Sequence, residues 1–89
     1  MFVLFPYSAS DFVCPVEDIA NTGCEGPKDC LYPNPNNCES YIQCTVNADQ
    51  VTGTPVVMPC ASENPSLQWN DITKECDYPE NSTCPSTKK

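Results

Sequence analysis

Histidine and arginine are both absent from this 89-residue sequence, and lysine occurs only four times. Without histidine, the chain lacks the commonest metal ligand and the commonest general base in proteins. A net charge of -8 provides no basic patch for a phosphate backbone or an anionic membrane surface. No apolar run is long enough to cross a bilayer. These absences argue against a nucleic-acid-binding protein, a membrane protein and most classes of enzyme.

Cysteine, in contrast, is abundant and even in number, with eight residues in the chain. In a small protein this density is typical of a secreted domain held by disulfides, because thiols stay reduced in the cytosol. Four bridges at roughly 2–4 kcal/mol each would supply about 8–16 kcal/mol. That range matches the whole stability of a typical domain, roughly 5–15 kcal/mol. The sequence therefore predicts an extracellular domain stabilised mainly by its disulfides. Cysteine spacing alone does not decide which of the 105 possible pairings forms.

Metal binding and catalysis are disfavoured by the spacing of the candidate residues. Structural zinc sites use close Cys-x2-4-Cys pairs, whereas the tightest pairs here, Cys24 with Cys30 and Cys38 with Cys44, have five residues between them. Glycoside hydrolysis needs two facing carboxylates, one of them with a pKa raised by burial. Carboxylates are plentiful near the C-terminus, but a loop-rich module offers little burial. We therefore predict no metal, no cofactor and no catalytic residue.

The chain divides into three parts around its cysteines. Residues 1–13 form an apolar appendage, interpreted as a cloning remnant or a clipped leader, residues 14–84 form the cysteine-bounded module, and residues 85–89 form a polar tail. The first third of the module is rich in turn signals, with one helical turn over Val16–Ala20. Strand formers follow at 40–46 and 54–58, and a shorter hairpin fits 66–70 and 75–77. The predicted fold is small, disulfide-rich and mostly β.

The segment Leu67-Gln68-Trp69-Asn70-Asp71 is the strongest candidate for a binding site. An exposed Trp ring gains much when the flat apolar face of a sugar covers it. Neighbouring amides and carboxylates can bond N-acetyl and hydroxyl groups. Trp69 could instead belong to the core, but its position at a hairpin tip followed by two polar residues favours exposure.

Three further features carry weaker signals. Tyr41 and Tyr78 each lie within three residues of a cysteine in the sequence and are expected to pack against disulfides. Asn81-Ser-Thr83 is an N-glycosylation sequon, which predicts a surface loop and a glycoprotein. Lys28, in the short loop between Cys24 and Cys30, supports the alternative of a disulfide-rich protease inhibitor or toxin-like ligand of a protein target.

The cysteine framework and several motifs resemble a known family. Six cysteines, Tyr41 between Cys38 and Cys44, the stretch 67–70 and the motif 76–79 are similar to the type-2 chitin-binding (peritrophin-A) domain, whose architecture tachycitin shares. The segments 26–35, 41–44, 55–57, 67–71 and 76–79 resemble more closely the secreted chitin-binding avirulence effectors of leaf-mould fungi. The resemblance covers nearly the whole module.

This resemblance implies a fold, a disulfide pattern and a site. The fold would be tachycitin-like, with a three-stranded antiparallel sheet and a short two-stranded hairpin. The implied bridges are Cys14–Cys44, Cys24–Cys30, Cys38–Cys84 and Cys60–Cys76. Chitin binding would centre on Trp69, Asn70 and Asp71, with Gln68, Tyr41, Asp77 and Tyr78 as further contacts.

The resemblance also implies a biological role. The protein would bind chitin and chito-oligosaccharides without catalysis, in the plant apoplast and on the fungal cell wall. It would shield hyphal chitin from plant chitinases, and a plant receptor-like immune protein would sense it. We expect a monomer in isolation that long oligomers can bridge into larger assemblies.

Overall fold

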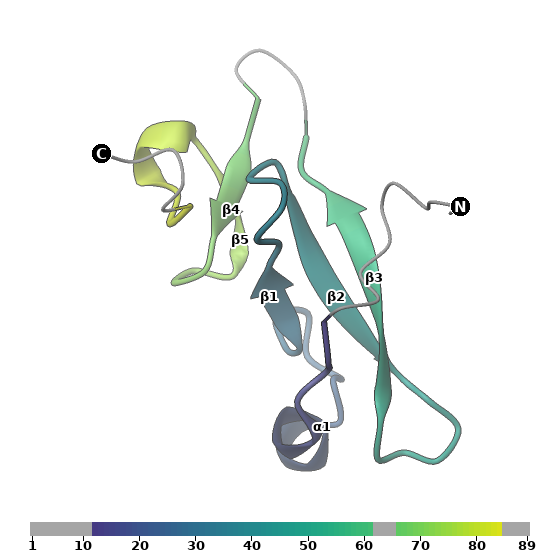
Figure 1. Cartoon of the computed structure of the whole chain (residues 1–89). Coiled ribbons are helices and arrows are strands. Elements are labelled where there is room, and N and C mark those ends of the chain that lie inside the picture. Colours follow the sequence, from purple (N-terminus) through teal and green to yellow (C-terminus); the bar gives the residue numbers. More distant parts are fainter. Residues whose placement is uncertain (1–11, 62–65, 85–89) are drawn as a thin grey trace, which may run out of the picture.

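The computed structural model describes residues 12–61 and 66–84 (Figure 1). Within these ranges the chain forms two short helices and five strands. In chain order the elements are α1 (Val16–Thr22), β1 (Leu31–Pro33), β2 (Ser40–Val46), β3 (Gly53–Pro59), β4 (Gln68–Asn70), β5 (Glu75–Asp77) and the 3-10 helix η1 (Pro79–Asn81). The small, mostly β fold that the sequence predicts is confirmed.

The strands form two antiparallel units. β2 lies between β1 and β3 in a three-stranded sheet, and β4 pairs with β5 in a separate hairpin. The hairpin and η1 lie at one end of the molecule, whereas α1 lies beyond the opposite end of β1 (Figure 1). The longer strands agree with prediction to within one residue. The sequence reading did not locate β1, because its residues lie among turn signals.

Helix α1 is longer than the predicted turn and ends at a glycine. Gly23 follows the helix with φ 66°, a left-handed conformation, and its N–H donates to Ile19 O at 2.8 Å. Glycine adopts this conformation without strain. The hydrogen bond that it allows satisfies a carbonyl that would otherwise be free at the helix end. Gly53 has a different role, because a Cβ there would lie 3.1 Å from Ile19 Cδ1. The two glycines end the helix and let it approach the start of β3 closely.

Disulfides supply much of the interior. The four bridges join Cys14 to Cys44, Cys24 to Cys30, Cys38 to Cys84 and Cys60 to Cys76, the same pairs that the resemblance implies. Ile19 packs among the buried cysteines, and Phe12 and Tyr32 cover them. The Phe12 and Tyr32 rings lie 5.2 Å apart, and the Tyr32 hydroxyl donates to Asp18 Oδ2 at 2.6 Å. Burial, with the Asp18 carboxylate beside it, raises the pKa of Tyr32.

The outer edge of β3 has two prolines four residues apart, Pro55 and Pro59. The Cys44 N–H donates to Cys30 O, away from β3, and Cys44 lies opposite Pro55. In an antiparallel pair this geometry turns the main chain of Pro55 toward the free edge. Pro59 is opposite Ser40, four residues from Cys44, and has the same orientation. Because proline has no N–H, two donors are missing from the strand edge that another chain could otherwise pair with.

Some predictions fall wholly or partly outside the described residues. The polar tail 85–89 lies outside them, as does the predicted appendage 1–13 except for Phe12 and Val13. Phe12 packs on the core. No helix within 12–61 and 66–84 is long and apolar enough to cross a membrane.

Candidate functional site

The predicted exposure of Trp69 is wrong. In β4 the side chain is buried, with 3% of the residue exposed. Its ring stacks on Tyr41 of β2, with centroids 4.4 Å apart and planes 19° from parallel. Its indole N–H donates to Asp71 Oδ1 at 3.1 Å, so the one polar atom of the buried side chain has a partner inside the fold. The β4 main chain is also bonded to the segment before β2, since the main-chain N–H of Trp69 donates to Cys38 O. Trp69 therefore fixes the hairpin against the sheet.

Asn70 organises the turn between β4 and β5. Its side-chain oxygen accepts the N–H groups of Ile72 and Thr73 at 2.9 and 3.2 Å. Its side-chain nitrogen donates to the carbonyl oxygen of Asn81 at 3.0 Å. The residue is 7% exposed. A buried amide with all these partners holds a turn, so little of it remains for an external ligand.

Asp71 and Lys74 connect the hairpin to the sheet. Asp71 Oδ1 accepts from Lys74 Nζ at 2.8 Å, in addition to the Trp69 indole. The same ammonium donates to the carbonyl oxygen of Leu31 in β1 at 3.0 Å and lies 5.6 Å from the Tyr32 ring centroid. The side chain of Asp71 remains 39% exposed. Asp71 can therefore accept an outside hydrogen bond while it orients Trp69.

Lys28 forms a second connection to the hairpin. Its ammonium donates to the carbonyl oxygen of Thr73 at 3.0 Å and lies 3.5 Å from Glu75 Oε1. The short Cys24–Cys30 loop that carries it thus leans on the β4–β5 turn. An inhibitory loop needs an available side chain, and these contacts do not favour that role for Lys28.

An exposed tyrosine, Tyr78, lies where the β4–β5 hairpin leads into η1. Tyr78 is 51% exposed, so the expected packing of this ring against a disulfide is wrong. Its N–H donates to the side chain of Asp77 at 2.7 Å. Asp77 lies opposite Gln68 across the hairpin, and both are half-buried. An exposed ring, a carboxylate and an amide therefore lie together at the β5–η1 junction.

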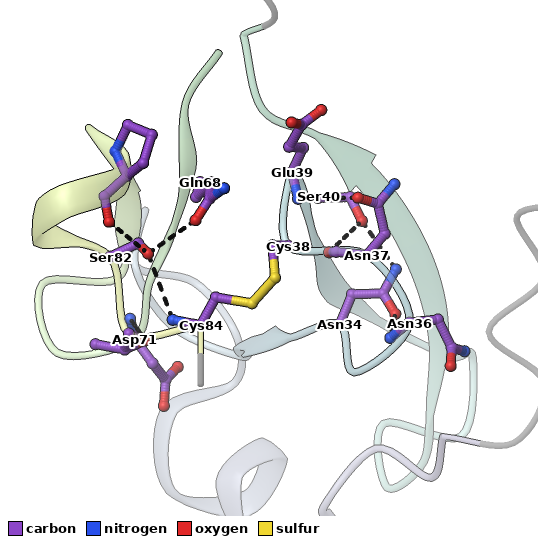
Figure 2. Close-up of a disulfide and its surroundings, with 12 residues drawn as sticks. Asn34, Asn36, Asn37, Cys38, Glu39, Ser40, Gln68, Asp71, Ser82 and Cys84 are labelled. Atoms are coloured by element: carbon purple, nitrogen blue, oxygen red, sulfur yellow. Dashed lines mark hydrogen bonds between the residues drawn. A yellow bond between two sulfur atoms is a disulfide. The ribbon is translucent and has the colours of Figure 1, made fainter. Parts of the chain in front are cut away.

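Ser82 and Thr83 bind the C-terminal segment to the hairpin, and the sequence reading missed this role. The Ser82 hydroxyl donates to Gln68 Oε1 at 3.0 Å, and Thr83 Oγ1 accepts the Asp71 N–H at 2.8 Å. Figure 2 shows the Cys38–Cys84 bridge joining this side to the segment that leads into β2. The sequon was the only sequence signal that drew attention to these two residues.

An apolar cavity of about 440 Å³ lies beside this bridge. It is lined by aromatic rings, prolines, the Cys38–Cys84 bridge and three polar residues: Phe12, Tyr32, Pro33, Asn34, Pro35, Cys38, Ser40, Trp69, Thr83 and Cys84. The polar side chains already have partners, since the Asn34 amide donates to Ser40 Oγ at 2.8 Å and Thr83 Oγ1 accepts the Asp71 N–H. The cavity therefore offers few polar groups for a sugar.

Among the described residues, no group of three or more His, Cys, Asp or Glu side chains is placed to hold a metal ion. The fold and these contacts define a small, disulfide-stapled β module with a surface hairpin locked to its sheet. The chain belongs to the chitin binding Peritrophin-A domain family, whose model matches residues 24–84.

Two curated relatives support this assignment. Race-specific elicitor A4 of Passalora fulva is 50% identical over 74 residues, which are 81% of this chain and 53% of that protein. Peritrophin-1 of Anopheles gambiae is 39% identical over 54 residues, which are 61% of this chain and 29% of that protein. The chain thus spans about half of the first relative and less of the second.

Two solved structures are also similar. Avirulence protein 4 from Pseudocercospora fuligena is 54% identical with a TM-score of 0.74, over 82% of this chain and 96% of that one. Avirulence protein 4 from Cladosporium fulvum, bound to the hexasaccharide of chitin, is 46% identical with a TM-score of 0.75. That match covers 96% of this chain and all of the other (100%). The resemblance to fungal chitin-binding avirulence effectors is confirmed.

Proposed function

We propose that this protein binds chitin without transforming it. The observation that carries the proposal is its likeness, at 46% identity and a TM-score of 0.75, to an avirulence protein whose structure holds a chitin hexasaccharide. Membership of the chitin binding Peritrophin-A family supports the same ligand. A non-catalytic role fits a chain without histidine. The carboxylates of the hairpin also lie at the surface. Glycoside hydrolysis would need a carboxyl group whose pKa is raised by burial.

The contact surface is proposed to be the unit β4, β5 and η1, with roles revised from the sequence prediction. Tyr78 presents the exposed ring for stacking on a pyranose face. Gln68 and Asp77 flank it with an amide and a carboxylate, and Asp71 contributes its exposed oxygen. Trp69 and Asn70 are proposed to support this surface without touching the sugar, because the Trp69 ring is buried and the Asn70 amide is already hydrogen-bonded within the turn.

A co-sedimentation experiment with insoluble chitin tests both parts of the proposal. The oxidised wild-type protein is expected in the pellet, and Tyr78→Ala is expected to bind about two- to tenfold more weakly, since a stacked ring contributes roughly 0.5–1.5 kcal/mol. Tyr78→Phe keeps the ring and is the matched control. Wild-type protein left in the supernatant would overturn chitin binding. Equal binding by Tyr78→Ala would overturn only the assignment of the surface.

Oligomer length provides a second test of the binding mode. One stacked sugar gives little affinity once the costs of association are met, so affinity should climb with chain length. Long oligomers should also bridge two protein molecules, because one chain can then occupy two surfaces. Calorimetric titration from trimer to hexamer would measure both trends. A trimer that binds as tightly as a hexamer would count against them.

We propose further that the protein is extracellular and protects fungal cell-wall chitin in the plant apoplast. Four disulfides suit an oxidising compartment. The relatives named as a race-specific elicitor and as avirulence proteins support an encounter with a plant immune receptor. Chitin coated with the protein should release fewer soluble oligosaccharides when a plant chitinase is added. Unchanged release at saturating coverage would contradict the protective role.

A further inference from the structure

We infer that Asn81 is an N-glycosylation site and that the glycan is added before the Cys38–Cys84 bridge closes. Asn81-Ser-Thr83 satisfies the sequon rule, which the chitin-binding function does not use. Asn81 ends η1 at the surface. Its main chain makes the contacts that hold it, since its carbonyl oxygen accepts from Asn70 and its N–H donates to Tyr78 O. The exposed side chain can therefore carry a glycan without loss of those bonds.

The folded chain, in contrast, protects the sequon from the enzyme that would modify it. The N–H groups of Asn81, Ser82 and Thr83 donate to Tyr78 O, Pro79 O and Trp69 O at 2.9, 3.2 and 3.1 Å. Thr83 Oγ1 accepts the Asp71 N–H at 2.8 Å. An oligosaccharyltransferase needs the three residues free of such bonds, with the threonine hydroxyl available. The transfer must therefore precede docking of this segment on the hairpin.

The transfer itself is a simple substitution. Asn81 Nδ2 attacks the anomeric carbon of an oligosaccharide carried on a polyprenyl diphosphate. A carbon–nitrogen bond forms, the bond from that carbon to the diphosphate oxygen breaks, and the amide nitrogen loses one proton. The lipid diphosphate is the leaving group, so no oxidant or reductant is consumed.

Closure of the bridge competes with this reaction. Cys84 directly follows Thr83 in the sequence, and its bond to Cys38 joins residues 46 positions apart. Once that bond has formed, the sequon is held beside β4 (Figure 2). Glycosylation of the native chain should therefore be partial, with the occupancy set by the order of the two events.

Expression through a eukaryotic secretory pathway tests the site. Intact mass should show a glycan that peptide N-glycosidase removes, leaving a mass increase of about one dalton as Asn81 becomes an acid. Asn81→Gln and Thr83→Ala should both lack it, whereas Thr83→Ser, which keeps the hydroxyl, should retain it at lower occupancy. A secreted, fully oxidised wild-type chain without glycan would overturn the proposal.

The order of events has its own test. Occupancy is measured on the total cellular chain, so that a variant that fails to be secreted still counts. The double variant Cys38→Ser/Cys84→Ser should show at least twofold more of the glycosylated chain relative to the bare one, as should wild-type cells pulsed with dithiothreitol. Cys24→Ser/Cys30→Ser is the matched control and should match wild type. Complete occupancy of the oxidised wild-type chain, or no rise in either arm, would overturn the competition. Neither test depends on chitin binding.

Discussion

Asn70 is buried and bonds three main-chain groups with one side chain. Asn70→Ala leaves the N–H groups of Ile72 and Thr73 and the carbonyl oxygen of Asn81 without these partners. We expect a loss of about 2 kcal/mol in the free energy of unfolding, because each of the three hydrogen bonds contributes roughly 0.5–1.5 kcal/mol. Urea unfolding measures it. Asn81→Ala is the control, since Asn81 contributes its carbonyl, and should cost under about 0.5 kcal/mol. Equal losses would refute this role for Asn70.

Asp49 gives the β2–β3 turn a dependence on pH. The N–H groups of Thr52 and then Val51, followed by the Thr52 hydroxyl, lower the pKa of Asp49. The carboxylate thus contributes stability above its unfolded pKa, near 3.9. That contribution is lost as pH falls through the lower, folded pKa. Thermal melting from pH 6 to 2 should show a smaller acid loss in Asp49→Asn than in wild type. Parallel curves would contradict it.

At the level of single residues, the sequence predicted a hairpin where β4 and β5 form, but it assigned the wrong exposure to Trp69 and Tyr78. The composition of 67–71 indicated an aromatic and amide cluster, which is what the structure contains. It could not show that Tyr41, distant in the sequence, would stack on Trp69 and bury it. Exposure of Tyr78 likewise depends on how η1 leaves β5. Such contacts arise from packing between elements. The pattern of residues within one element does not predict them.

Among the elements, the edge of β3 is the most open to a direct test. Pro55→Val restores an outward N–H to the edge of the sheet, so we expect self-association at concentrations where wild type stays monomeric. Sedimentation velocity across a concentration series would detect it. Val56→Thr is the matched control, because Val56 lies opposite Gln43 and its main chain faces β2. A monomeric Pro55→Val chain throughout the series would rule out this function for the proline.

The strands illustrate what an element-level prediction can reach. β2 and β3 are rich in strand formers with a clear turn between them, so their bounds were predicted closely. β1 is only Leu31–Pro33, and it forms because Leu31 and Tyr32 pair with Gln43 and Ile42 of β2. A three-residue strand has too little pattern of its own to be identified. Its existence depends on the neighbouring strand.

For the whole molecule, the disulfides differ in what each constrains. Cys38–Cys84 joins residues 46 apart and Cys24–Cys30 residues 6 apart. Loop-closure entropy predicts losses of about 4 kcal/mol and about 2 kcal/mol when each pair is changed to alanine. Urea unfolding of the two double variants under non-reducing conditions would compare them. A larger loss for the short loop would show that its contacts with the hairpin, through Lys28, outweigh the entropy.

Spacing left the bridges undetermined, and only the family resemblance pointed to one pattern. Even a correct pattern does not place the Cys24–Cys30 loop against the β4–β5 turn. Lys28 makes that connection, and Lys74 joins the same turn to Leu31 of β1. The sequence drew attention to Lys28 only as an inhibitory contact and gave Lys74 no role. The architecture was therefore more predictable than the way its two units are held together.

The burial of Trp69 has a spectroscopic consequence. It is the single tryptophan of the chain, so intrinsic emission reports on this indole alone. In the oxidised protein that emission comes from a buried ring stacked on Tyr41, whereas opening of the bridges would expose the ring to water and shift the emission to longer wavelength. A sugar seated on Tyr78 would leave it nearly unchanged. The protein thus carries an optical probe of its framework that is separate from its binding surface.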